Sequence, residues 1–145
     1  MKIQTKYFGE TEIEESKILH FPVGLPAFEE IHDFIMIDLP DNPNFLCLQS
    51  TVKADVAFLL IHPWDFFPDY DIDIPDEDLE ELEIGRKEQV LVLATVTIPQ
   101  DPDQMTANLL APIIINTETM KGKQVVLHDS PYSVKHPLFP EREAV

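Results

Sequence analysis

The sequence predicts a mainly β domain, a small closed or nearly closed antiparallel β-barrel or roll with one short acidic helix. Two observations lead to this prediction. Thirteen prolines are spread along the chain, and proline ends or kinks helices, so no proline-free stretch is long enough for a large helical bundle. Between the prolines lie short runs rich in β-branched and aromatic residues, and turn signals separate them, as in all-β folds.

The strands are predicted in chain order from these runs. Residues 2–8 alternate, with Ile3, Thr5 and Tyr7 on one face, as in a half-buried strand. Residues 89–98 form the clearest strand. The other predicted strands cover residues 11–13, 17–21, 33–38, 45–50, 56–61, 107–116 and 124–128, with a turn at residues 120–123.

One helix is predicted after Pro75. Asp76 can cap it, and carboxylates crowd its first turns, which suits the positive end of the helix dipole. Leu79 and Leu82 give it a small apolar stripe, and Gly85 is placed to end it.

The length of 145 residues predicts one domain, which we place at residues 1–138, followed by a flexible C-terminal tail at residues 139–145. No apolar run is long enough to span a membrane. The N-terminus lacks the pattern of a signal peptide. The single cysteine, Cys47, excludes an intramolecular disulfide. We therefore expect a cytoplasmic protein.

The net charge of −17 limits the possible partners. Nucleic acid is a poor partner, because binding it requires basic side chains that neutralise phosphates. A basic protein surface is a good partner, because an acidic field speeds its association. The competing interpretation is that the charge only keeps the protein soluble.

No catalytic, cofactor-binding or metal-binding residue is predicted. The chain has no glycine-rich phosphate loop, its five histidines are scattered, and Cys47 lies in an apolar run with no neighbouring base. Asp69, Asp71 and Asp73 resemble the start of a calcium loop. However, Ile74 stands where such a loop needs glycine, so we expect a solvated strand-like segment there.

Residues 65–83, called here the acidic segment, hold ten carboxylates and no basic residue. Aromatic residues are interleaved with the carboxylates or flank them, either as anchors on the barrel or as part of a protein-binding surface. We predict that this segment contributes to a partner-binding surface through Tyr70, Asp71, Asp73, Asp76, Glu77 and Glu80.

Two motifs add a family resemblance. They are FPVGLPAFE at residues 21–29 and TANLLAPIIIN at residues 106–116. Together with the N-terminal strand and the acidic segment, they make the chain resemble the FliW family of bacterial flagellar assembly factors over roughly residues 2–138. Ala27 departs from the pattern, because a second glycine is expected there.

The resemblance implies a non-enzymatic regulator with two alternative partners. One partner is flagellin, bound in the cytoplasm before export. The other is CsrA, a small basic dimeric RNA-binding repressor. Flagellin secretion would free the protein to bind CsrA beside its RNA site and so relieve repression of flagellin translation. That the acidic field contributes to this binding is our own inference.

A second partner contact is predicted around Asn108, Leu110 and Pro112. Pro112 implies an edge, a bulge or a crossover, because proline cannot donate to a β-ladder. Asn108 could instead bond to turn backbone. Three other functions remain open for the whole chain: an acidic export chaperone for flagellin alone, a metal-dependent enzyme that uses Asp69, Asp71 and Asp73, and a DNA-mimic inhibitor.

Overall fold

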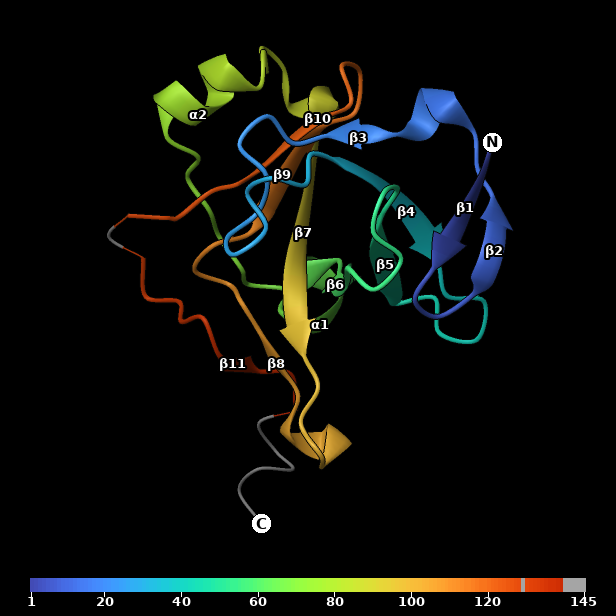
Figure 1. Ribbon diagram of the computed structural model, residues 1–145. Coiled ribbons are helices and arrows are strands. Elements are labelled where there is room, and N and C mark those ends of the chain that lie inside the picture. Colours follow the sequence, from blue (N-terminus) through green and yellow to red (C-terminus); the bar gives the residue numbers. More distant parts are fainter. Residues whose placement is uncertain (129, 140–145) are drawn as a thin grey trace.

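A computed structural model describes residues 1–128 and 130–139 (Figure 1). Its strands are β1 (Lys2–Thr5), β2 (Gly9–Glu12), β3 (Leu19–His20), β4 (Asp33–Asp38), β5 (Phe45–Ser50), β6 (Ala57–Ile61), β7 (Val90–Thr97), β8 (Thr106–Ala107), β9 (Ile113–Asn116), β10 (Lys121–Gln124) and β11 (His136–Pro137). Two short α-helices occur in the described residues, α1 (Pro63–Phe66) and α2 (Asp76–Glu81), along with 3₁₀ turns at Glu15–Lys17, Lys87–Gln89 and Pro102–Gln104.

Seven strands close into a barrel in the order β3, β4, β5, β6, β7, β9, β10 and back to β3. All neighbouring pairs in this ring are antiparallel except the closing pair, β10 with β3, which is parallel and matches Lys121 to His20. The predicted β-barrel is therefore confirmed, with one parallel pairing and one additional helix, α1.

Strand β9 and the middle of β7 bury both of their faces, because the barrel is covered on the outside there. Successive strand residues point to opposite faces. Leu93 and Ile115 belong to the cluster inside the barrel. Their chain neighbours Val92 and Ile114 belong to a second cluster with Tyr70, which lies under the acidic segment. This two-sided burial explains why residues 89–98 read as a nearly continuous apolar run.

The β1–β2 hairpin forms a separate two-stranded sheet beside β4 (Figure 1). Ile3 and Ile13 pack against Ile35 of β4. The buried Gln49 side chain accepts a 3.0 Å hydrogen bond from the Lys6 N–H. The strand predicted at residues 2–8 is too long, because β1 ends at Thr5. Tyr7, placed on its buried face, is instead 61% exposed.

Three of the other predicted strands are confirmed, and one is wrong. Residues 33–38 and 45–50 form strands with the predicted bounds, and residues 89–98 form β7 with one residue fewer at each end. The single strand predicted at residues 107–116 is wrong, because only its two ends pair, as β8 and β9.

The turn predicted at residues 120–123 and the strand at 124–128 are wrong. The turn comes earlier: the Asn116 Oδ1 accepts the N–H groups of Glu118 and Thr119, and Met120 has a φ of 62°. Gly122 lies inside β10 instead. A Cβ atom there would meet the Phe21 ring at 2.7 Å, so this glycine permits close packing rather than a turn.

Helix α2 begins at Asp76, as predicted, but Asp76 is its first helical residue rather than its cap. The helix ends before Gly85. Glu83 adopts a φ of 57°, and the Ile84 N–H bonds back to Leu79 O at 2.9 Å, so Glu83 takes the left-handed position expected of glycine. Of the predicted tail, residues 140–145 lie outside the described residues.

Candidate partner-binding surface

Tyr70 joins the two segments that were predicted to bind partners. Its hydroxyl donates a 2.7 Å hydrogen bond to Leu109 O, and its own carbonyl accepts the Trp64 indole N–H at 2.7 Å. Tyr70 is 4% exposed. Burial, with a smaller contribution from Tyr132, raises the pKa of the Tyr70 hydroxyl above its usual range. The structure thus gives Tyr70 a positioning role beneath the surface.

The loop between β8 and β9 is held by its own backbone. The Asn108 Oδ1 accepts the Ala111 N–H at 2.9 Å, which is the turn-bonding role considered for it. Pro112 is buried, and its carbonyl accepts the Val125 N–H at 2.9 Å. Leu110 is half-buried. Asn108 and Leu110 therefore offer partly open surface, whereas Pro112 supports the loop from within.

The inner side of α2 is anchored to β10 by ion pairs. Lys123 bonds to Asp78, which is 6% exposed, and to Glu81 at 2.7 Å. These hydrogen bonds, Asp78 first, raise the pKa of Lys123. Lys121 pairs with Glu83 at 2.8 Å. The basic residues of β10 thereby neutralise the carboxylates that face the barrel.

The outer carboxylates of the acidic segment have no such partners among the residues that the structure describes. Five of the predicted site residues are exposed there, and no basic side chain in the described part of the chain forms an ion pair with any of them. We call this set the outer acidic face: Asp71, Asp73, Asp76, Glu77 and Glu80.

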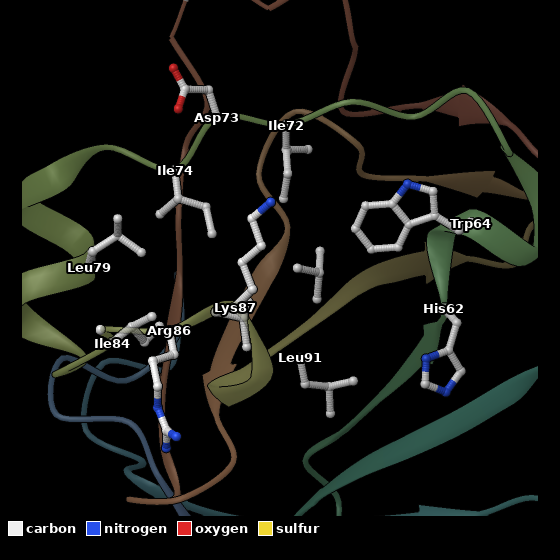
Figure 2. Close-up of a pocket in the computed structure, with 13 residues that line it drawn as sticks. His62, Trp64, Ile72, Asp73, Ile74, Leu79, Ile84, Arg86, Lys87 and Leu91 are labelled. Carbon is white, nitrogen blue, oxygen red and sulfur yellow. The ribbon is translucent and has the colours of Figure 1, made fainter.

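An apolar groove of about 670 Å³ lies between the acidic segment and the start of β7. Figure 2 shows Ile74, Leu79 and Ile84 along one wall and the Trp64 ring on the other. Lys87 extends its amine across the groove towards Ile72, whereas Arg86 points away from it (Figure 2). Arg86 pairs with Glu118.

The side chains considered for metal binding or catalysis can be placed among the described residues. No group of three or more His, Cys, Asp or Glu side chains there could hold a metal ion. Cys47 is 1% exposed, and burial raises the pKa of its thiol, so it stays protonated. No helix in the described ranges is long and apolar enough to cross a membrane.

Comparison with known proteins adds a family. The model of the FliW protein family matches residues 2–138. This chain belongs to the FliW family.

Similar FliW proteins cover nearly the whole chain. The flagellar assembly factor FliW of Moorella thermoacetica is 45% identical over 97% of this chain and 90% of that protein. The one from Geobacillus thermodenitrificans is 44% identical over 99% of both. A crystal structure of a flagellar assembly factor FliW superposes with a TM-score of 0.91 at 42% identity, over 98% of this chain and 99% of that one.

The sequence of this FliW-family chain did not predict the groove or a role for Lys87. Its lining comes from α1, α2, residues 72–74 and β7, which are distant in sequence. One signal was available: Arg86 and Lys87 are the first basic residues after the ten carboxylates of the acidic segment. The sequence alone could not show that its amine lies over an apolar floor.

Proposed function

We propose that this protein is a non-enzymatic cytoplasmic flagellar assembly factor that binds flagellin and, when free of flagellin, binds CsrA and relieves its repression of flagellin translation. Family membership supports the flagellar role, since relatives carry the name flagellar assembly factor. The partners are those implied by the resemblance of the motifs at residues 21–29 and 106–116. No membrane or nucleic-acid partner is proposed.

The outer acidic face is the observation that carries the CsrA part of this proposal. Its five carboxylates have no ion-pair partners among the described residues, so their field extends into solvent. Unpaired surface charge of one sign attracts a basic protein over a distance of about 10 Å at 0.1 M salt. Once bound beside CsrA's RNA site, the same charge would repel an RNA backbone.

The electrostatic part is tested by removing charge without changing shape. We expect the triple variant Asp76→Asn, Glu77→Gln, Glu80→Gln to associate with CsrA about tenfold more slowly at low salt, because steering is worth roughly 10- to 1000-fold in rate. Its association rate should also depend less on salt. Stopped-flow kinetics across a salt series measures both effects.

A matched control separates this face from total charge. The variant Glu15→Gln, Glu30→Gln, Asp55→Asn removes three exposed carboxylates elsewhere and should leave the rate nearly unchanged. Equal slowing by both triple variants would show that only net charge matters. Unchanged kinetics in the first variant would remove the outer acidic face from the proposal.

The alternative of an export chaperone for flagellin alone predicts a different outcome. Such a protein would bind flagellin and leave CsrA unbound at any salt concentration. A pull-down with purified CsrA distinguishes the two functions.

A further inference from the structure

Among the described residues, the first half of β7 has a strand on one side only. β6 pairs with β7 at Leu60 with Thr95 and Ile61 with Ala94, and nowhere else. Continuing that register would place Pro63 opposite Val92. Proline has no N–H to donate, and α1 begins at Pro63 and turns the chain away. Residues 90–93 of β7 therefore pair with β9 and leave their other edge open.

The direction of the backbone groups follows from their alternation along an antiparallel strand. The Gln89 carbonyl accepts the Thr117 N–H at 2.8 Å, and the Thr95 carbonyl accepts the Asn108 N–H at 2.9 Å. Both lie on the side of β9 and β8. The backbone N–H and C=O groups of the odd-numbered residues of β7 therefore point to that side. Those of the even-numbered residues point to the groove.

Three backbone groups remain at the open edge. The Val90 N–H bonds to Lys87 O as the end of a 3₁₀ turn. The Val90 C=O and both backbone groups of Val92 have no such bond within the described residues. Both residues line the groove. A buried backbone group without a partner is costly. These three groups therefore need water or a ligand as a hydrogen-bond partner.

The side chains around this edge match an extended, mainly aliphatic segment. Ile74, Leu79 and Ile84 provide apolar contact on one wall, the Trp64 ring lies on the opposite wall, and Ile72 lies between the two walls (Figure 2). Lys87 is an exposed cation over this apolar floor and forms no ion pair with a carboxylate of the described chain. In a protein of net charge −17, an unpaired lysine at this place complements a carboxylate on the ligand.

We propose that the groove binds an extended segment of a partner protein, which adds to the edge of β7 as an antiparallel strand along the line that β6 leaves. One ligand residue exchanges two hydrogen bonds with Val92, and the residue two positions away donates to the Val90 C=O. Aliphatic ligand side chains lie on the groove floor, and a carboxylate between them reaches Lys87. This is recognition by strand addition, in which the backbone gives affinity and alternate side chains give specificity.

The free protein offers the first test. Amide hydrogen exchange of the full chain, followed by NMR, should show Val92 exchanging about tenfold or more faster than Leu91 and Leu93, whose N–H groups face β9. Equal protection of all three amides would mean that the edge is already covered, and would overturn the proposal.

The second test adds a ligand. The probe is a peptide with blocked ends and the sequence TVDVTV. We expect chemical-shift changes at Val90, Lys87 and Val92, and slower exchange of the Val92 amide. N-methylation of the alternate peptide residues that face β7 should abolish these changes, whereas N-methylation of the others should preserve them. No shift at millimolar peptide, or equal effects of the two methylation patterns, would overturn strand addition.

The charge is tested in the protein. Lys87→Glu should weaken peptide binding about threefold to tenfold, in line with an exposed ion pair that becomes a repulsion. Lys53→Glu, at the other end of β6, makes the same charge change away from the groove and should have no effect. Equal weakening in both variants would contradict a carboxylate contact at Lys87. None of these three tests uses flagellin or CsrA, so their results stand apart from the proposed function.

Discussion

Ala27 has a φ of 70°, in the left-handed region, and stands where the family resemblance suggests glycine. This region costs a non-glycine residue about 1–2 kcal/mol, and glycine gives back about 0.5–1 kcal/mol in entropy. We expect Ala27→Gly to raise the free energy of unfolding by about 0.5–1 kcal/mol, measured by urea denaturation. Ala54→Gly, at an exposed position without positive φ, should lower it. A loss of stability in both variants would contradict the strain at Ala27.

The Tyr70 hydroxyl should stabilise the fold in a way that depends on pH. Replacing it with Phe removes the donor to Leu109 O and should cost about 1–3 kcal/mol at pH 7. Folding raises the Tyr70 pKa above its ordinary value of 10.0, so the folded state keeps this proton where the unfolded state loses it. The wild-type stability that depends on this group is therefore complete below pH 10 and falls as the pH rises further.

The Tyr70→Phe variant lacks this titration, so its stability difference from wild type should shrink above pH 10. Denaturation at pH 7, 9 and 10.5 measures the trend. A difference that stays constant with pH would show that the hydroxyl is not shielded.

Helix α2 is attached to β10 through the ion pair between Lys123 and Asp78. Lys123→Met leaves Asp78 nearly buried without its cation, and we expect a loss of about 2–4 kcal/mol, because breaking such a pair is costly. The double variant Lys123→Met, Asp78→Leu should recover much of that loss. Equilibrium unfolding of the four proteins in this cycle gives the coupling. Additive losses would mean that α2 does not depend on the pair.

The elements also show what could be predicted from the sequence. β4, β5 and β7 follow from local apolar runs between turn residues. The split of residues 107–116 into two strands does not follow from local sequence. It depends on long-range hydrogen bonds from the N–H groups of residues 125 and 127 to Pro112 O and Leu110 O. The outer acidic face was visible as composition. The neutralised inner side of α2 was not, because it requires knowing that β10 lies beside it.

The open edge of β7 lies between these cases. Pro63 signals the end of a strand, and that much is local. Which residue of β7 loses its partner depends on the register of β6 against β7, and the long connection at residues 62–89 does not determine that register. For the same reason the sequence could not show that Tyr70 and Pro112, two of the predicted contacts, are buried, because burial is a property of the assembled barrel.

In the molecule as a whole, the barrel determines which carboxylates are neutralised and which remain exposed. The barrel closes through a single residue pair between β10 and β3 and presents β10 to α2. The inner carboxylates are neutralised there, and the outer ones remain in solvent. This arrangement places the outer acidic face, which has no ion pairs among the described residues, next to the apolar groove.

We propose that this protein acts by binding flagellin and CsrA in turn. Calorimetric titration with purified flagellin and purified CsrA, each alone and then with the other already bound, tests it most directly. We expect each partner to bind alone and bound flagellin to prevent CsrA from binding. Absence of CsrA binding, or simultaneous binding of both partners without loss of affinity, would contradict the switch.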